Sequence, residues 1–514
     1  TNVDSVGIAT ARTGIDVTGG HIDLVDNSKI RVGTGDDLDL YHDTTDTYLR
    51  NQTGQFLIRG NDIKLQSYLG ETYATLANNN AVSLYYDNSK KLETTTTGAK
   101  VTGALEVTQE YPSIRPTLDL NFAATKTLDR RITFTRDSLG TYTDDMGIIK
   151  YASNNVPRFD HDFGTGESLG LLIEESRTNL LSYSTSFNLW SSVSLMSISV
   201  NNQTAPDGTQ TAAKFIFPTN PATTPFCTQL YTFSAAAHTF SVFAKYNGIQ
   251  YLWLNIWDGA VSRRAIFDIQ NGTLGSTQNS PSGQTITAYG NGWYRCTISA
   301  TTSAGSGDLS IRFANSSSDF DSDTITGNGS DGQYIWGAQL EQGSFATSYI
   351  PTSGSTVSRA QDSAKITGIN LTDFYNQPEG TIFADYKVIQ SDPDIFYLSN
   401  GQSSKRIGLY EAGSSQTRFI IGNSGTVADT TDSAGTTVGD NIKSAGAYKL
   451  NDIVAAKNGV ISSTDSSATI PDGIDRAYIG GYYEGTAEGV LGLRRLSYYN
   501  KRLPNAQLQG LTQQ

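Results

Sequence analysis

The sequence feature that most constrains the fold is the alternation of apolar and polar residues over short runs. In Tyr251-Leu-Trp-Leu-Asn-Ile-Trp, Leu252, Leu254 and Ile256 occupy every second position. Successive side chains of a strand point to opposite faces, so this pattern predicts a β-strand with one buried face. The chain holds 50 Gly and 27 Tyr and only 17% charged residues, which favours many short strands joined by tight turns. The sequence therefore predicts an all-β fold.

The spacing of these patterns divides the chain into four segments. Residues 1–108 hold short runs that echo one another, such as Leu38-Asp-Leu-Tyr-His-Asp and Val82-Ser-Leu-Tyr-Tyr-Asp. Runs this short cannot close a large core within one chain, so they predict a β-rich shaft built from several chains. We interpret residues 109–178 as a connector, 179–358 as a jelly-roll β-sandwich and 359–514 as a second β-sandwich. Pro504 predicts one short helix near the end.

Charge and hydropathy exclude several classes of partner. The formal net charge of −13 opposes a phosphate backbone, so nucleic acid is not an expected partner. No run approaches the roughly 18 apolar residues of a membrane span. Cys227 and Cys296 are too few for a disulfide framework and lack metal-type spacing, so we expect two small buried side chains. The chain begins with Thr1 rather than Met, which suggests a fragment or a processed chain.

An ordered set of motifs between Pro112 and Arg359 resembles the lectin-like regions of bacteriophage tail-fibre and virion proteins. The motifs are Arg131-Ile-Thr-Phe-Thr-Arg, Pro157-Arg-Phe-Asp-His-Asp, Gly166-Glu-Ser-Leu-Gly-Leu-Leu-Ile-Glu-Glu, Arg177-Thr-Asn-Leu-Leu, Asn291-Gly-Trp-Tyr-Arg, and Trp336-Gly-Ala-Gln-Leu-Glu through Ser348-Tyr-Ile-Pro-Thr.

Other parts of the chain carry further resemblances. From Asn179 onward the sequence is similar to carbohydrate-binding modules of the jelly-roll type. The C-terminal part, with Ala477-Tyr-Ile-Gly-Gly and Leu496-Ser-Tyr-Tyr-Asn-Lys-Arg-Leu-Pro, resembles concanavalin A-like or laminin G-like sandwiches. The first hundred residues are similar to fibre repeats of marine and cyanobacterial phages. These resemblances imply an external appendage of a virion, built as a homotrimer and assembled in the host cytoplasm beside other virion proteins.

The strand at residues 251–257 carries the candidate carbohydrate site. Its face opposite the core stripe would present Tyr251, Trp253, Asn255 and Trp257. Sugar C–H faces stack on aromatic rings while sugar hydroxyls bond planar amides and carboxylates, so this face suits a saccharide. If their strands share its sheet, further residues would form a polar rim: Arg312, Gln339 and Glu341. The alternative is that the aromatic stripe packs under the connector or against another subunit.

No motif predicts catalysis. Gly166-Glu-Ser-Leu-Gly matches the nucleophile-elbow pattern around Ser168, but that elbow needs a following helix, and the residues that come next favour a strand. A glycoside hydrolase needs two carboxyl groups at a set separation across a cleft, and no spacing marks such a pair. We therefore expect a protein that is not an enzyme.

Two acidic stretches raise the question of metal binding. The loop Asp319-Phe-Asp-Ser-Asp323 has the oxygen density of a structural Ca²⁺ loop but lacks the features of an EF-hand. We therefore favour a solvated acidic loop and keep a structural Ca²⁺ site as the alternative. Asp160-His161-Asp162 offers ligands that alternate between two faces, which favours local hydrogen bonding. No cofactor is expected, and the identity of any metal site stays open.

Three hypotheses for function follow. The first is a non-enzymatic phage fibre that attaches the virion to a bacterial surface polysaccharide or lipopolysaccharide, with affinity multiplied by several copies. The second is a structural or decorative virion protein whose aromatic surfaces are intersubunit interfaces. The third is a glycan depolymerase, which two cleft carboxylates with one raised pKa would favour.

Overall fold

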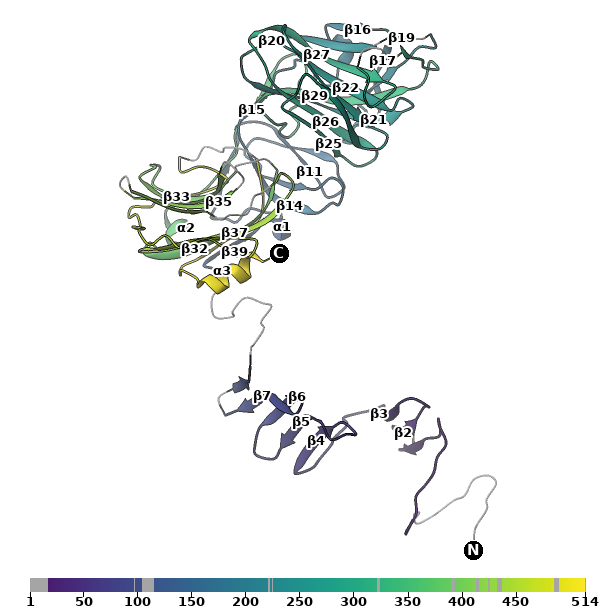
Figure 1. The fold of residues 1–514 in the computed structure, drawn as a ribbon, viewed down its shortest axis with the longest axis vertical. Helices are drawn as coiled ribbons and strands as arrows, with labels where there is room; N and C mark the ends of the chain where they lie inside the picture. The colour runs from purple at the N-terminus through teal and green to yellow at the C-terminus, as the bar shows by residue number, and fades with distance from the viewer. Residues whose placement is uncertain are drawn as a thin grey trace. The chain divides into compact units, whose positions relative to one another are not determined.

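The structure is a computed structural model, and it describes residues 17–96, 98–103, 115–220, 222–223, 225–320, 324–389, 393–412, 416–423, 426–431, 437–484 and 490–513. The chain forms two compact units, Thr1–Thr108 and Gln109–Gln514. Figure 1 shows both units and labels many of their elements. The fold is all-β with antiparallel sheets, which confirms the predicted class.

Two small sheets make up the described part of the first unit. One has the order β1-β2-β3 and the other β4-β5-β6-β7-β8. Their bounds are β1 Ile30–Val32, β2 Leu38–His42, β3 Thr47–Asn51, β4 Asp62–Gln66, β5 Thr72–Ala77, β6 Val82–Tyr86, β7 Ser89–Thr95 and β8 Gly98–Val101. Among the described residues of this unit, Ala74 is the only buried hydrophobic residue. The sheets therefore enclose no core within one chain.

The N-terminal sandwich of the second unit has two six-stranded sheets. The first, β16-β20-β27-β22-β23-β24, contains β16 Ser192–Ser194, β20 Phe226–Phe233, β22 Tyr251–Trp257, β23 Ser262–Asp268, β24 Thr273–Gln278 and β27 Gly305–Ala314. The second, β17-β18-β29-β21-β26-β25, contains β17 Ser197–Gln203, β18 Ala212–Ile216, β21 Ala237–Asn247, β25 Gly283–Ala288, β26 Trp293–Thr301 and β29 Gly332–Gln342. The core between the sheets includes Cys227, and the buried Cys227 and Cys296 are both free, as expected.

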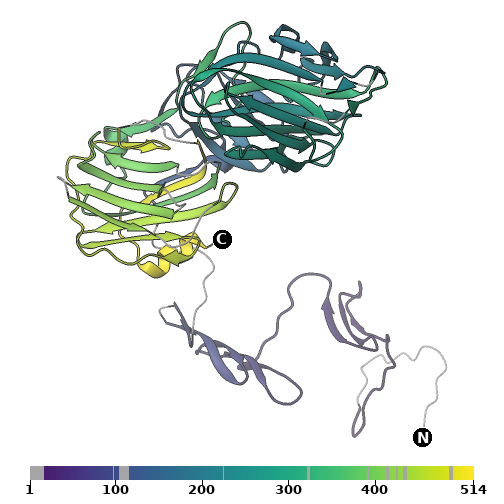
Figure 2. The same cartoon turned by 45° about the horizontal axis from the view of Figure 1, so that its top comes forward.

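The C-terminal sandwich packs a seven-stranded sheet against an eight-stranded one. The seven-stranded sheet, in the order β10-β31-β40-β33-β34-β35-β36, contains β10 Thr133–Thr135, β31 Ser363–Thr367, β33 Asp394–Ser399, β34 Lys405–Ala412, β35 Gln416–Asn423, β36 Thr426–Thr431 and β40 Arg476–Ile479. The other, β13-β14-β41-β32-β37-β38-β39 with β9 beside β41, contains β9 Leu118–Asn121, β13 Arg158–His161, β14 Ser168–Glu174, β32 Glu379–Val388, β37 Asn441–Lys449, β38 Asp452–Lys457, β39 Val460–Ile461 and β41 Val490–Tyr499. Figure 2 shows both sandwiches as layered sheets.

Short elements complete the second unit. Three two-stranded pairs are formed by β11 Gly140–Thr143 with β12 Ile149–Ala152, β15 Arg177–Asn179 with β30 Val357–Arg359, and β19 Ala222–Thr223 with β28 Thr324–Ile325. The helical elements are α1 Phe122–Thr125, η1 Phe187–Leu189, α2 Ile369–Thr372 and α3 Asn505–Thr512. Pro504 is the N-cap residue of α3, which confirms the predicted helix. Among the described helices, none is long and apolar enough to cross a membrane.

Residues 109–178 do not form the separate connector that the sequence suggested. The segment contributes β9, β10, β13 and β14 to both sheets of the C-terminal sandwich. Leu120 and Leu171 lie in the same hydrophobic core as Ile382 and Leu496. The correction has a physical cause: β9 and β14 bury their leucines by pairing with β41, more than 300 residues later in the sequence.

A β-bulge at Gly337 changes which residues of β29 share a face. Perfect alternation would place Trp336 with Ala338 and Leu340, but the pairing with β21 shifts by one residue. Ile335, Ala338 and Leu340 face the central core, whereas Trp336 packs in a separate aromatic cluster on the other face. Gly337 has φ +61°, and a Cβ there would lie 2.9 Å from the Phe243 ring, so glycine is needed at the bulge.

Candidate functional site

The candidate strand β22 divides its side chains between two faces as the sequence predicted. Leu252, Leu254 and Ile256 lie in the core of the N-terminal sandwich. Tyr251 and Trp253 belong to a different cluster on the outer face of the sheet. The alternation was therefore a correct guide to the two faces of this strand.

Trp253, however, is fully buried, and the expectation of an open aromatic platform is corrected at this residue. The Phe320 ring lies edge-on to it with a centroid separation of 5.4 Å. The guanidinium groups of Arg264 and Arg312 each lie 5.1 Å from its ring. Its indole N–H donates to the Phe313 carbonyl at 3.2 Å. Since burying a large aromatic ring stabilises a sandwich, the loop after β27 folds over Trp253 instead of leaving it for a ligand.

The other three residues of this face differ in exposure. Asn255 is 3% exposed, and its Oδ1 accepts a hydrogen bond of 2.5 Å from Ser262, so its amide is used within the protein. Tyr251 is half-buried. Trp257, at the end of β22, is 39% exposed and retains a ring surface open to solvent.

The predicted polar rim is only partly brought together. Arg312 on β27 is the paired residue of Trp253 on the same sheet. Gln339 and Glu341 lie on β29 in the opposite sheet, so the expectation that all these strands share one sheet is corrected. Both are fully buried and hold the loop after β29: Gln339 Oε1 accepts from the Ile350 N–H at 2.6 Å, and Glu341 accepts from the Thr347 hydroxyl at 2.5 Å.

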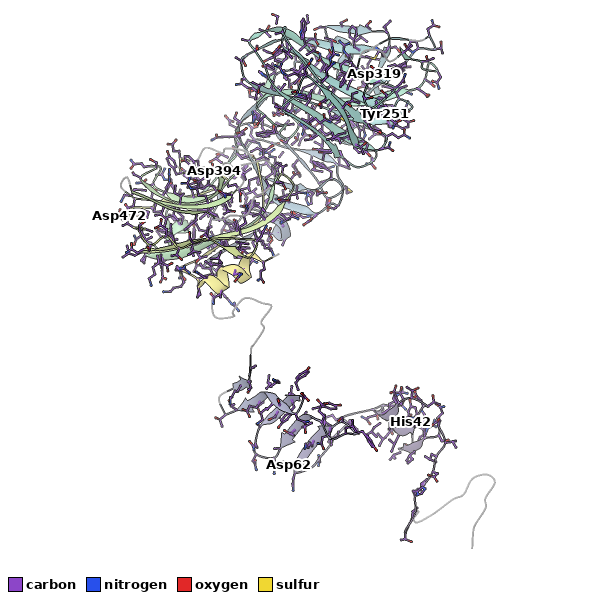
Figure 3. The ribbon with its side chains drawn as sticks, in the orientation of Figure 1. His42, Asp62, Tyr251, Asp319, Asp394 and Asp472 are labelled. Carbon is purple, nitrogen blue, oxygen red and sulfur yellow. The ribbon has the colours of Figure 1, made fainter. Side chains whose placement is uncertain are left out.

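Neither of the two acidic stretches, 160–162 and 319–323, brings the ligands of a metal ion together among the described residues. Asp319 lies in the loop that covers Trp253, and Figure 3 labels it with Tyr251. Asp321 and Asp323 lie outside the described residues, so the solvated loop and its Ca²⁺ alternative both stay predictions. Asp160 and His161 both bond the backbone of Thr143, which is the local hydrogen bonding that the sequence favoured. Among the described residues, no three His, Cys, Asp or Glu side chains are placed to share an ion.

A cavity of about 580 Å³ lies where the two sandwiches of the second unit meet. Its walls come from β25 and β26, from β11 and β13, from residues 344–349 after β29, and from β32 and the start of β41. A volume of this size matches the range of small-molecule sites in proteins. The cavity, unlike β22, was not predicted from the sequence, because its walls come from five distant segments.

Hydroxyl groups line the wall that the N-terminal sandwich supplies. Thr285 on β25 pairs with Thr297 on β26, and Thr287 pairs with Arg295, and all four line the cavity. Thr285 and Thr287 are exposed, whereas Thr297 and Arg295 are buried. The Arg295 guanidinium donates to the Thr347 carbonyl at 2.7 Å, which fixes the loop that forms the next wall. This wall therefore offers several hydroxyl groups at fixed positions.

Aromatic rings and a lysine complete the cavity. The rings of Phe163 and Tyr289 stack at an interplanar angle of 26°, and both residues line it. Lys387 reaches from β32 and pairs with Asp162 at 2.8 Å. Apolar rings beside hydroxyl and charged groups are the mixture that orients a polyhydroxylated ligand.

Among the carboxyl groups that line the cavity, Asp160 has the pKa that is shifted furthest from its ordinary value. Burial raises its pKa to about 7, although its Oδ1 accepts a hydrogen bond of 2.6 Å from the Thr143 N–H, which acts in the opposite direction. Near neutral pH the cavity wall therefore includes a carboxyl group that is partly protonated.

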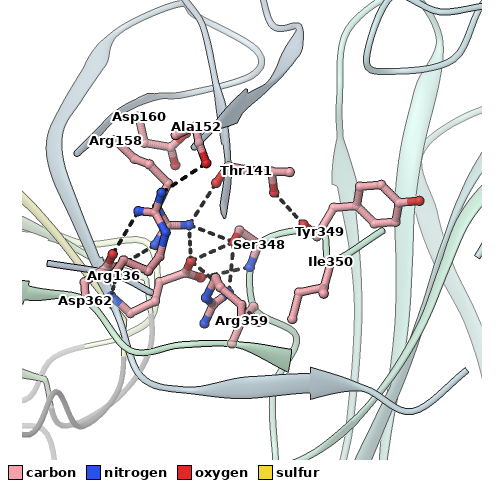
Figure 4. Close-up of polar contacts among 12 residues, drawn as sticks. Arg136, Thr141, Ala152, Arg158, Asp160, Ser348, Tyr349, Ile350, Arg359 and Asp362 are labelled. Atoms are coloured by element: carbon pink, nitrogen blue, oxygen red, sulfur yellow. Dashed lines mark hydrogen bonds and ion pairs between the residues drawn. The ribbon is translucent and has the colours of Figure 1, made fainter. Parts of the chain in front are cut away.

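A buried ion network beside the cavity joins the two sandwiches (Figure 4). Arg158 on β13 donates to Glu174 at 2.5 Å and to Asp362 at 2.5 Å. Arg359 pairs with Glu174 at 2.9 Å, and the Ser348 hydroxyl of the N-terminal sandwich donates to Glu174 at 2.6 Å. The motifs that carry the phage resemblance hold Arg158, Glu174 and Ser348, and Arg359 ends the span that they cover. Those motifs therefore encode the junction between the sandwiches.

Glu174 also lines the cavity, but its oxygens are occupied by this network. Burial alone would raise its pKa, yet the neighbouring Arg359 and Arg158 lower it to about 2. A carboxylate held by two arginines and Ser348 is part of the framework. Ser168 begins β14, so the strand expected after the elbow-like motif is confirmed and the elbow geometry is absent.

No protein-family model matches this sequence, and no curated protein matches it. Solved structures similar to parts of the chain include a carbohydrate-binding module, a pentraxin and a pair of laminin LG domains. The carbohydrate-binding module CBM40 of the Ruminococcus gnavus IT-sialidase is 17% identical, covers 28% of this chain and 88% of its own, and has a TM-score of 0.26. The SAP-like pentraxin of Limulus polyphemus is 12% identical, covers 26% of this chain and 68% of its own, and has a TM-score of 0.21. Domains LG4-5 of the mouse laminin α1 chain are 10% identical, cover 54% of this chain and 86% of their own, and have a TM-score of 0.20.

Proposed function

We propose that this protein is a non-enzymatic phage fibre that attaches the virion to a bacterial surface polysaccharide or lipopolysaccharide. The observation that carries the proposal is the junction cavity, which is lined by threonine hydroxyl groups, aromatic rings and the Lys387–Asp162 pair. Planar and hydroxyl hydrogen-bonding groups beside aromatic rings are the chemistry that saccharides need. The ordered motifs that resemble phage lectin-like regions support the virion setting.

The first unit supports a multichain shaft, which we propose is a homotrimer. In its five-stranded sheet an apolar stripe runs through paired residues, from Leu65 through Ala74 and Leu84 to Leu92 and Val101. Leu65, Leu84 and Val101 are exposed. Exposed apolar stripes of this extent mark interaction surfaces, and copies of the same chain would cover them. Several weak saccharide sites on one fibre would then act together.

The test of the proposal is a glycan array with the whole chain and a cavity-filling variant. Thr285→Trp places a large side chain on the exposed cavity wall, whereas Thr277→Trp makes the same change at an exposed position on β24, away from the cavity. We expect the Thr285 variant to lose binding and the Thr277 variant to retain it. Equal binding by both variants would remove the cavity from the proposal, and a chain that binds no glycan would favour the structural virion protein.

A glycan depolymerase is the second candidate function, because two carboxyl groups with opposite pKa shifts line the cavity. Asp160 has the raised pKa of a general acid. The second carboxylate, Glu174, accepts hydrogen bonds from Arg158 and Ser348. Its oxygens are therefore used within the protein and are not free to act on a ligand. We therefore favour binding without hydrolysis. Release of reducing ends from the bound glycan by the wild-type chain, abolished in Asp160→Asn, would overturn that preference.

A further inference from the structure

The outer face of the seven-stranded sheet in the C-terminal sandwich carries a group of tyrosine and arginine side chains. On β33, β34 and β40 the apolar residues Leu398, Ile407 and Ala477 point into the core. The residues that alternate with them point away from it. We call this surface, together with two tyrosines from the segment after β40, the Tyr-Arg face. Its members are Tyr397, Arg406, Arg476, Tyr482 and Tyr483.

Strand pairing places these residues side by side. Tyr397 on β33 is paired with Gly408 on β34, and Arg406 is paired with Ser399. Ser399 is in turn paired with Arg476 on β40. A Cβ at Gly408 would lie 2.1 Å from the Tyr397 ring, so that ring lies across the strand where a side chain would otherwise stand. Glycine here makes room for the Tyr397 ring, which is itself only 1% exposed.

Two tyrosines from the segment after β40 supply the rings that are open to solvent, and one of them packs on the buried Tyr397 ring. The rings of Tyr482 and Tyr483 lie 4.2 Å apart, and Tyr482 meets Tyr397 edge-on at 5.2 Å. The Ser399 hydroxyl donates to the Tyr483 carbonyl at 2.7 Å, which ties this segment to the sheet. Tyr482 and Tyr483 are half-buried, so part of each ring is open to solvent.

Arg406 lies against both of these rings and lacks an anionic partner. Its guanidinium is 5.1 Å from the Tyr483 ring centroid, and it donates to the Tyr482 hydroxyl at 3.2 Å. Arg476 differs, because Asp475 pairs with it at 2.6 Å. Among the described residues no carboxylate lies within ion-pair distance of Arg406, and its Nε has no hydrogen-bond partner. That Nε is buried, but Arg406 as a whole is half-buried, so its terminal Nη groups can donate to a planar anion.

We propose that the Tyr-Arg face is a second saccharide-binding surface, specific for a glycan that bears carboxylate groups. Tyr482 and Tyr483 would stack on a sugar ring, and Arg406 would pair with the carboxylate of that sugar or its neighbour. This surface lies on a different sandwich from residues 283–299, which form the hydroxyl wall of the junction cavity. The proposal does not depend on a ligand in that cavity.

The test is binding of the whole chain to an array of uronate- and sialate-containing oligosaccharides, with their carboxyl-reduced neutral counterparts on the same array. We expect the acidic forms to bind and the reduced forms to bind at least tenfold more weakly. Arg406→Gln should weaken binding of the acidic forms at least tenfold. Lys405→Gln is the matched control, since it removes the same charge from the neighbouring residue, which pairs with Asp472.

Two further variants make the outcome decisive. Tyr483→Leu, at a partly exposed ring, should weaken binding of the acidic forms, and Glu484→Gln should strengthen it two- to threefold by removing an exposed negative charge beside that ring. The proposal fails if no acidic form binds, if the reduced forms bind as well, or if the Arg406 and Lys405 variants behave alike with unchanged melting temperatures.

Discussion

Arg158 and Glu174 form an ion pair of 2.5 Å in which both side chains are buried, at the point where the two sandwiches meet. Ser348, from the N-terminal sandwich, donates to the same carboxylate oxygen at 2.6 Å. The pair therefore fixes the loop at residues 344–349 and, with it, one wall of the cavity. Ionic contacts of this kind define an orientation between two domains more sharply than apolar contacts do, because charge pairing depends on geometry.

Glu174→Gln should destabilise the second unit strongly. The substitution leaves two buried guanidinium groups without their shared carboxylate, and breaking a buried pair in this way costs about 3–5 kcal/mol. Urea unfolding measures the change in free energy. Glu167→Gln is the control, since Glu167 is exposed and lies 3.5 Å from Arg494, and a change below about 0.5 kcal/mol is expected. Similar losses in both variants would contradict the assigned role of the network.

Asp160 should make stability depend on pH near neutrality. The folded state raises its pKa from 3.8 to about 7, so the folded protein holds this proton where the unfolded chain releases it. The stabilising contribution is complete below about pH 4 and is lost as the pH rises through 7, amounting to roughly 4 kcal/mol. Melting temperatures between pH 5 and 8 measure it. Asp160→Asn should flatten this dependence, and the exposed Asp137→Asn should not; an unchanged slope in Asp160→Asn would refute the assignment.

Trp253 and Trp257 should respond differently to truncation. Trp253→Ala removes a fully buried indole and leaves a cavity, which costs about 3–5 kcal/mol. Trp257→Ala removes a side chain that is 39% exposed and should cost less than about 1 kcal/mol. Thermal unfolding distinguishes the two variants. Loss of glycan binding in Trp253→Ala together with a lower melting temperature would reflect the fold, whereas the same loss in Trp257→Ala at an unchanged melting temperature would mark a contact with the glycan.

Leu84→Lys should disrupt assembly of the shaft. Leu84 is 48% exposed in the middle of the apolar stripe of the five-stranded sheet, and a charged side chain there would be buried against neighbouring copies. Light scattering after size-exclusion chromatography should show a smaller oligomer. Asn80→Lys, in the exposed turn between β5 and β6, adds the same charge and should leave the mass unchanged. A wild-type chain that is monomeric would overturn the proposed trimer.

Local patterns in the sequence identified the strands and their buried faces. Alternation assigned Leu252, Leu254 and Ile256 to the core, and this is confirmed. Pro504 marked the start of the short helix α3. These features depend on residues within a few positions of one another, because the period of a strand and the cap of a helix are local properties.

The tertiary structure alone decided which faces stay open. Alternation placed Trp253 on the outer face, but Phe320, 67 residues later, covers it. The bulge at Gly337 moved Trp336 away from Ala338, which a strict period of two cannot anticipate. The cavity and the network of Arg158 and Glu174 depend on strand pairings between distant segments. Sequence periodicity determines which side of a strand is apolar, whereas the exposure of the other side depends on what the rest of the chain packs against it.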